Sequence, residues 1–185
     1  ARRGDKEVQE PLLESLGRLA DEDLTEAQSL EALRVLQLCF MRMGRPDAET
    51  AEEVIQALSR FYPAKTESLN RELCQLLIYL EAPDVITKTL ALMAAAPTQA
   101  EPMHYAFALR NLKSGWTSEQ RRVYFSWFNK ALREYQGGNS PFTESGNDID
   151  VDAQGNAYVA GETASRVFPT TPGALEDLKA SVTSI

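Results

Sequence analysis

The spacing of apolar residues is the feature that most constrains how this chain can fold. From about Lys6 to Gln136, apolar side chains recur at intervals of three and four residues, which is the period of an α-helix. Proline, glycine and capping residues interrupt the pattern repeatedly. The pattern therefore predicts about seven helices of roughly 12 to 20 residues, joined by loops short enough to make neighbours antiparallel.

Capping residues predict where several of these helices begin. Thr25, Thr98 and Thr117 each start a capping box, in which a hydroxyl and a Glu or Gln three residues later satisfy free backbone N–H groups. Asp47 and Asp84, each directly after a proline, are predicted to start two more helices. Paired helices stacked in order would form a HEAT-like α-solenoid, which we favour, although a compact bundle uses the same signals.

The composition restricts the classes of partner. A net charge of −8 argues against a nucleic-acid-binding protein, because phosphate backbones require a basic surface. No apolar run approaches the ~20 residues of a membrane span, so we expect none. No secretory signal opens the sequence, but a leader can be removed, so this leaves the compartment open.

The helical period ends at residues 136–141, a segment that contains two glycines and a proline. These residues predict a helix end followed by a hinge or linker. We therefore divide the chain into a helical domain, residues 1–138, and a small β segment, residues 139–185. The second part is the more acidic, with seven Asp and Glu against two Lys and Arg. Composition and pattern change at the same place.

Two short strands are predicted in the β segment. Residues 149–151 and 158–159 alternate in polarity on either side of a tight turn, Ala153-Gln-Gly-Asn156. Gly155 and Asn156 suit the positive φ angles of a hairpin turn. The Phe168-Pro-Thr-Thr-Pro-Gly173 stretch cannot pair along its length, because its two prolines lack N–H donors.

Acidic residues around this turn are candidate metal ligands. Asp148, Asp150 and Asp152, with Asn156, could supply oxygen ligands to calcium. The motif lacks the bidentate glutamate of a complete twelve-residue calcium loop. We interpret it first as a solvated, turn-forming acidic edge and keep calcium as the alternative.

The remaining reactive side chains favour structural roles. Cys39 and Cys74 lie on apolar helical faces and are expected to be buried free thiols, with a disulfide as the alternative. His104 is the single histidine and is interpreted as structural. No CxxCH or Cys/His cluster offers a haem or zinc site. Helical spacing predicts a packed core rather than a cofactor platform for five aromatic residues: Trp116, Tyr124, Phe125, Trp127 and Phe128.

Residues 69–95 and 104–138, including HYAFALRNLKSGWTSEQRRVYFSWFNKA, resemble a HEAT-like helical module. That module occurs in exported haem-containing dehydrogenase-type proteins of planctomycete and verrucomicrobial bacteria. It commonly lies there between a β-propeller and a cytochrome c segment. The resemblance implies a spacer and docking surface, and it assigns no catalytic residue to this chain.

Residues 148–175, DIDVDAQGNAYVAGETASRVFPTTPGAL, resemble an SBBP-type β-propeller repeat. Its D-x-x-G-N-x-Y-V core and its FPTTPGA tail are both present, but no second copy follows. A propeller needs roughly four to eight blades, so one unit cannot close a ring. Either the sequence is a fragment of a longer protein, which we favour, or the hairpin completes a blade formed by other chains.

These observations lead to a scaffold or protein-interaction module without catalytic residues of its own. The two resemblances imply an exported, periplasmic or extracellular setting, with a propeller or a cytochrome as partner. A second hypothesis is a docking domain of a haem- or quinone-cofactor oxidoreductase that passes electrons to a cytochrome c. A third, weaker hypothesis is calcium-dependent adhesion, which predicts that chelation lowers the melting temperature.

Overall fold

A computed structural model describes residues 6–20, 22–134 and 148–160 of the chain, and the predicted linker at 136–141 and the tail beyond 160 lie outside them. The described part is mainly helical, as predicted, and none of its helices is both long and apolar enough to span a membrane. The 3₁₀ turn η1 (Lys6–Val8) precedes seven helices: α1 (Gln9–Ala20), α2 (Glu26–Met43), α3 (Ala48–Ser59), α4 (Glu67–Tyr79), α5 (Val85–Ala95), α6 (Ala100–Leu109) and α7 (Ser118–Glu134).

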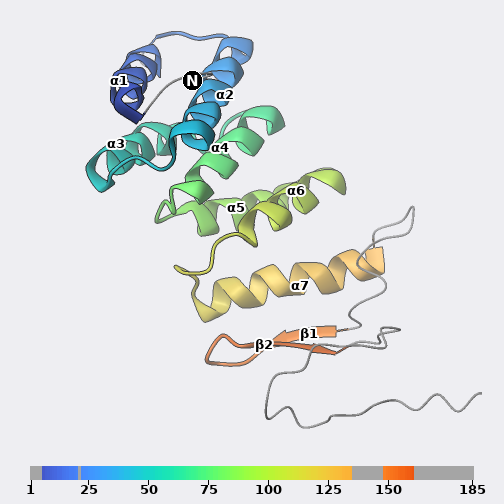
Figure 1. Cartoon of the computed structure of the whole chain (residues 1–185). Helices are drawn as coiled ribbons and strands as arrows, with labels where there is room; N and C mark the ends of the chain where they lie inside the picture. The colour runs from blue at the N-terminus through green and yellow to red at the C-terminus, as the bar shows by residue number, and fades with distance from the viewer. Residues whose placement is uncertain (1–5, 21, 135–147, 161–185) are drawn as a thin grey trace, which may run out of the picture.

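The helices stack in chain order, each against its near neighbours. α2 packs on α4 and α4 on α6, while α1 packs on α3 and α5 on α7. Figure 1 shows the resulting stack, with α1 and α2 at one end and α7 towards the other. Three side-chain-to-backbone hydrogen bonds join residues 35 positions apart: Gln9 with Gly44, Arg45 with Leu80, and Ser118 with Ala153. The arrangement is consistent with an α-solenoid-like stack.

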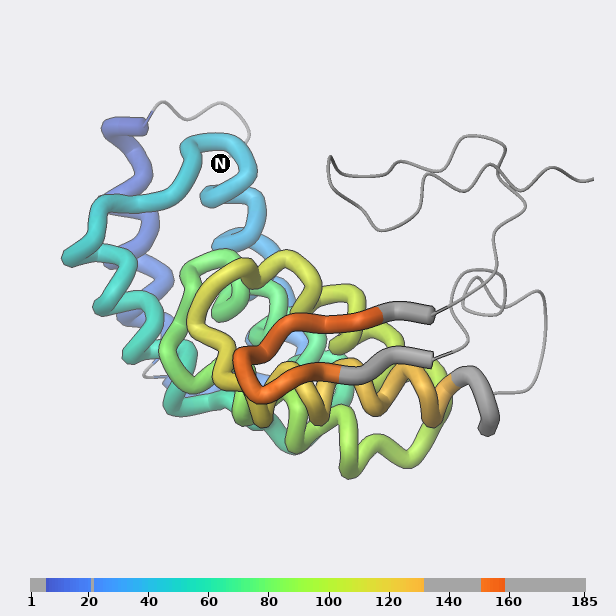
Figure 2. Tube along the Cα trace, turned by 90° about the horizontal axis from the view of Figure 1, so that it is seen from below, coloured from blue at the N-terminus to red at the C-terminus, as the bar shows by residue number. Residues whose placement is uncertain are grey.

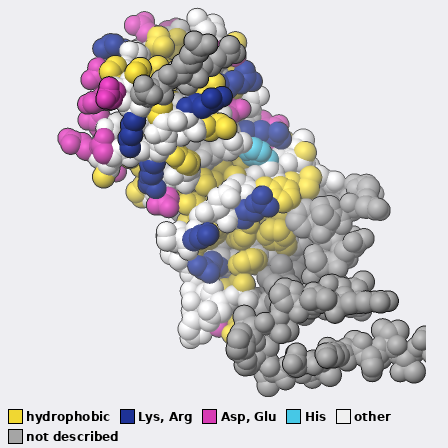
Figure 3. Space-filling view, in the orientation of Figure 1, with side chains coloured by type: hydrophobic (Ala, Val, Ile, Leu, Met, Phe, Trp, Pro, Cys, Tyr) yellow, Lys and Arg dark blue, Asp and Glu magenta, His cyan; other side chains and the backbone are white. Residues whose placement is uncertain are grey.

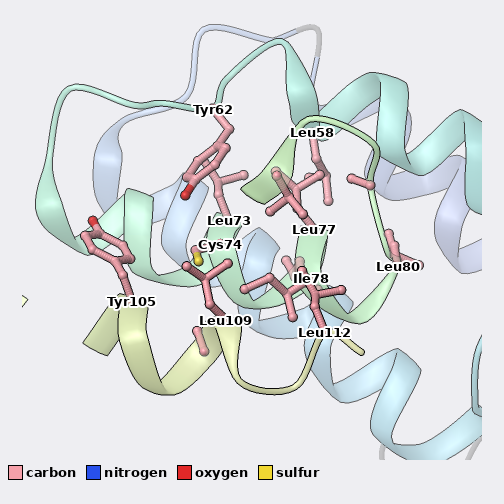
Figure 4. Packing of buried hydrophobic residues seen from close by; sticks show 14 of the residues in the cluster. Leu58, Tyr62, Leu73, Cys74, Leu77, Ile78, Leu80, Tyr105, Leu109 and Leu112 are labelled. Carbon is pink, nitrogen blue, oxygen red and sulfur yellow. The ribbon is translucent and has the colours of Figure 1, made fainter. Parts of the chain in front are cut away.

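Helix α4 is the centre of the hydrophobic core, because it contacts α2, α3, α5 and α6. Its apolar face is almost fully buried, with Leu77 at 1% exposure. Figure 4 shows Leu73 and Cys74 of α4 between Tyr62 on one side and Leu109 of α6 on the other. The i, i+3, i+4 spacing of the apolar residues in α4 places them on this shared face.

Three polar side chains of the core, Tyr62, Cys74 and Thr89, lie in contact with one another. The hydroxyls of Tyr62 and Thr89 lie 2.7 Å apart, and the Sγ of Cys74 lies 3.7 Å from the Thr89 hydroxyl. Burial raises the pKa of both the Cys74 and the Cys39 thiols. Both cysteines are free and buried, so the main prediction is confirmed and the disulfide alternative is wrong.

The predicted helix starts are confirmed in part. Both halves of the capping box form at Thr25 and at Thr117, and the Asp47 carboxylate caps α3. The Thr98 hydroxyl accepts the N–H of Glu101, but the Glu101 carboxylate accepts the Tyr105 hydroxyl instead of completing the box. Asp84 precedes α5 as predicted, without a side-chain capping bond.

The aromatic residues around α7 pack as core, as predicted. Tyr124 and Trp127 are buried, and Trp116, Phe125 and Phe128 pack against the same cluster. Ring centroids of neighbouring pairs lie about 5 Å apart in tilted or edge-to-face contacts. The Tyr124 hydroxyl donates to the Ala106 carbonyl oxygen at 2.9 Å, which ties α7 to α6.

The predicted hairpin is present and lies on α7. Strands β1 (Asp148–Val151) and β2 (Ala157–Ala160) pair antiparallel, with Val151 opposite Ala157. β1 packs along α7, and Figure 2 shows the hairpin running beside that helix. Val151 is only 3% exposed. A lone hairpin is marginal in water, so the surface of α7 contributes to its order.

We expect Leu77→Ala to destabilise the helical stack strongly, because it leaves a cavity at the centre of the core. The loss should be about 3 kcal/mol in the free energy of unfolding, measured by chemical denaturation followed by circular dichroism. Leu38→Ala is the matched control, since Leu38 is 42% exposed on α2 and should cost well under about 1 kcal/mol. Equal losses in the two variants would contradict the described packing of α4.

Candidate functional site

A groove crosses three successive levels of the stack, over α2, α4 and α6. We call it the α2–α4–α6 groove. Its volume is about 640 Å³, and its lining includes Met41, Tyr79 and Phe107, one from each helix. The face drawn in Figure 3 carries the single histidine, in cyan, which also lines the groove, beside a band of hydrophobic side chains.

Large apolar side chains of the groove are open to solvent. Met41 is 78% exposed, and Tyr79 and Phe107 are each 43% exposed. The Tyr79 ring stacks on Phe40, which is buried, at a centroid distance of 5.5 Å. Single exposed apolar residues are common on protein surfaces, but several along one groove are typical of a binding surface.

Each of the three levels also carries a side-chain amide in the groove. The Gln37 amide donates to the Glu72 carboxylate at 2.5 Å, and the Asn111 amide donates to the Phe107 and Ala108 carbonyl oxygens. The exposed Gln75 amide has no hydrogen-bond partner among the described residues. Unsatisfied amide groups beside exposed apolar side chains can bind polar groups of a partner.

Most charges near the groove have a partner, since Glu72 accepts the Gln37 amide and Arg71 pairs with Glu67. Glu81, its acidic lining residue, forms an ion pair with Arg45 at 3.4 Å. The Arg110 guanidinium lies over the Phe107 ring, 5.2 Å from its centroid. Within the described part of the chain, the Arg110 guanidinium has no hydrogen-bond or ion-pair partner. Arg110 therefore leaves a positive charge beside this apolar wall.

His104 lies in the lining of the groove, half-buried, with its ring edge-on to Tyr105. Burial, and then the positive charge of Arg71, lower the pKa of His104. The imidazole is therefore neutral near pH 7. Its buried Nε2 has no hydrogen-bond partner in the described structure. The sequence had indicated a structural histidine and gave no sign that it would line a groove.

The hairpin turn is organised by the carboxylate of Asp152. One oxygen accepts the backbone N–H groups of Gln154 and Asn156, both at 2.9 Å. The other accepts the Asn156 side-chain amide at 2.8 Å and the Tyr158 hydroxyl at 3.0 Å. Hydrogen bonds from Asn156 are the main cause of the lowered pKa of Asp152. Four donors thus occupy this exposed carboxylate.

The candidate calcium ligands are brought together only in part. Asp152 and Asn156 meet in the turn, whereas Asp148 and Asp150 lie on β1 and their side chains fall outside the described residues. No group of three or more His, Cys, Asp or Glu residues that could hold a metal occurs in the described part of the chain. The geometry of Asp152 is that of a turn-forming residue, and the calcium site stays a prediction.

The turn also makes close contact with the first turn of α7. Gly155 has φ of 86°, as predicted, while Asn156 does not have the predicted positive φ and uses its side chain instead. A Cβ at position 155 would lie 3.1 Å from the Ser118 Oγ. Ser118 donates to the Ala153 carbonyl oxygen at 3.3 Å, and Arg121 to that of Gly155 at 3.4 Å.

Sequence reasoning missed the groove residues. Gln37 and Met41 in α2, and Gln75 and Tyr79 in α4, share the same four-residue spacing of an amide and a large apolar residue. That recurrence was a usable signal. Nothing in the spacing says which apolar residues the neighbouring helices leave uncovered, so Met41 could not be distinguished from a core residue.

We expect Asp152→Asn to loosen the hairpin turn, because an amide nitrogen cannot accept the Asn156 and Tyr158 donors. In the wild type, the pKa of Asp152 is lower in the folded chain than in the unfolded chain. The ionised carboxylate therefore stabilises the turn above about pH 4, and this stabilisation is lost as pH falls through the folded pKa. NMR chemical shifts of the Val151 and Asn156 amides measure the effect of Asp152→Asn, and in the wild type, followed from pH 6 downwards, they measure the effect of pH. Asp47→Asn is the matched control, which should affect α3 and leave the hairpin unchanged.

Gly155→Ala should undock the hairpin from α7. The positive φ alone costs on the order of 1 to 3 kcal/mol, and the new Cβ also meets the Ser118 Oγ. Gly44→Ala is the matched control. It has the same cost of a positive φ, here 81°, but no atom lies within 4 Å of its new Cβ. NMR shifts of Ser118 and Arg121 should change only in Gly155→Ala, and Ser118→Ala should recover part of the docking. Unchanged shifts in Gly155→Ala would contradict this contact.

The groove and the docked turn are defined by contacts within the chain itself. Comparison with protein-family models, with curated proteins and with solved structures finds no match for this chain. Its function is therefore interpreted from these contacts.

Proposed function

We propose that this chain is a non-catalytic scaffold or protein-interaction module of an exported bacterial protein. The observation that carries the proposal is the α2–α4–α6 groove, in which Met41, Tyr79 and Phe107 expose apolar surface on three alternate helices of the stack. Burial of exposed apolar area is the main driving force of protein association. A partner that covers this groove would gain that free energy without any change in the core beneath.

The stacked helices and the hairpin have separate parts in this proposal. The helices form a HEAT-like α-solenoid, which presents the even-numbered helices α2, α4 and α6 on one face. The hairpin is a single SBBP-type unit held against α7. Its contacts through Ser118 and Arg121 support a role in joining the helical stack to a propeller or in covering its end.

A photo-crosslinking amino acid at position 41 tests the proposal in the cells that produce the protein. We expect a discrete crosslinked species at position 41, because Met41 is the most exposed of the large hydrophobic residues described. The same probe at position 19 is the matched control, since Leu19 is 45% exposed but lies on α1, outside the groove. The same species at both positions, or none at position 41, would contradict a partner on this face.

A further inference from the structure

The groove has a regular chemical pattern along the stack. On α2 and α4, an amide and a large apolar residue are separated by four positions, as Gln37 with Met41 and Gln75 with Tyr79. At the third level the same two types occur in the opposite order, as Phe107 of α6 with Asn111, which lies two residues beyond the end of that helix. On α2 and α4, residues four apart lie on the same side of the helix. At the third level, the Asn111 amide is held beside Phe107 by its hydrogen bond to the Phe107 carbonyl oxygen. Each level therefore offers one apolar contact and one amide to the same ligand.

The free hydrogen-bonding atoms of these amides match a peptide backbone. Gln37 and Asn111 use their N–H₂ groups within the chain, which leaves their carbonyl oxygens as acceptors. Gln75 has both its donors and its acceptor available. An extended peptide presents N–H and C=O groups to its sides, whereas a helix uses its own internally. The groove is thus suited to an extended segment.

The charges near the groove favour an acidic residue in that segment. Glu81 is already paired with Arg45, and His104 is neutral because burial and Arg71 lower its pKa. The Arg110 guanidinium lies over the Phe107 ring and has no carboxylate partner among the described residues. A carboxylate placed there would pair with Arg110 at the edge of an apolar surface.

We propose that the α2–α4–α6 groove binds a short extended segment of a partner protein. The segment turns apolar side chains towards Met41, Tyr79 and Phe107 and places one Asp or Glu beside Arg110. Three helices about 10 Å apart span about 20 Å, which is roughly six residues of an extended chain. This inference rests on the proposed interaction function and names the class of ligand for it.

The test uses the purified full chain and a display library of random octapeptides flanked by Gly-Ser linkers. Peptides are selected on the wild type and counter-selected on the variant Met41→Glu/Phe107→Glu. We expect the enriched peptides to share several apolar residues and an Asp or Glu. In fluorescence polarisation with a synthetic enriched peptide, the variant should bind at least about tenfold more weakly. Leu19→Glu, the matched control, should bind as the wild type does.

A double-mutant cycle tests the charge pair. Arg110→Gln should weaken binding about fivefold, and replacing the peptide's Asp by Asn should weaken it equally. The two changes together should cost no more than either one alone. Thermal melts by circular dichroism check that each variant stays folded. If the losses of binding free energy from the two changes add up in the double variant, the proposed pairing with Arg110 is wrong.

The remaining outcomes separate this inference from the proposed function. Selection of no peptide, selection of basic peptides, or helix formation by the bound peptide in circular dichroism would overturn the ligand class. If a crosslinked partner is still found at position 41, the interaction function stands. Peptides that bind Met41→Glu/Phe107→Glu as well as the wild type would show a different binding face and would overturn the groove itself.

Discussion

The burial of α4 is the constraint on which the rest of the structure depends. This helix contacts four others, and its apolar face, including Leu77 and Cys74, is almost fully buried. Because α4 lies between α2 and α6, it fixes the order of the three helices that form the groove. Its opposite side, with Gln75 and Tyr79, is left to solvent. The same helix therefore holds the core together and supplies the middle of the candidate binding surface.

A second consequence of stacking in chain order is that no helix follows α7 among the described residues to pack on its far side. α7 has neighbours in α5 and α6 on one side. On another side it meets the hairpin, through Ser118, Arg121 and the buried Val151. Stacks of helix pairs generally need a terminal element that differs from the internal levels, because the last apolar face has no following repeat. The hairpin occupies that position against α7.

The sequence predicted the features that depend on neighbouring residues in the chain. It did not predict which helix faces stay exposed after distant segments have packed together. The capping boxes at Thr25 and Thr117, the hairpin and the free thiols follow from residues close together in the chain, and all are present. Glu101 bonds Tyr105 rather than completing its predicted box, because a buried hydroxyl offered a competing donor. The groove depends on which helix faces are covered by residues about 35 positions away. Apolar spacing alone does not contain that information.

The hairpin turn satisfies its hydrogen bonds with residues close to it in the chain. Its D-x-x-G-N-x-Y residues are accounted for within the turn, because Asp152 accepts donors from Gln154, Asn156 and Tyr158, and Gly155 supplies the positive φ. The motif therefore specifies a local structure. Its apolar side chains still need a surface on which to be buried. Val151 is buried with β1 packed along α7, so this helix supplies that surface.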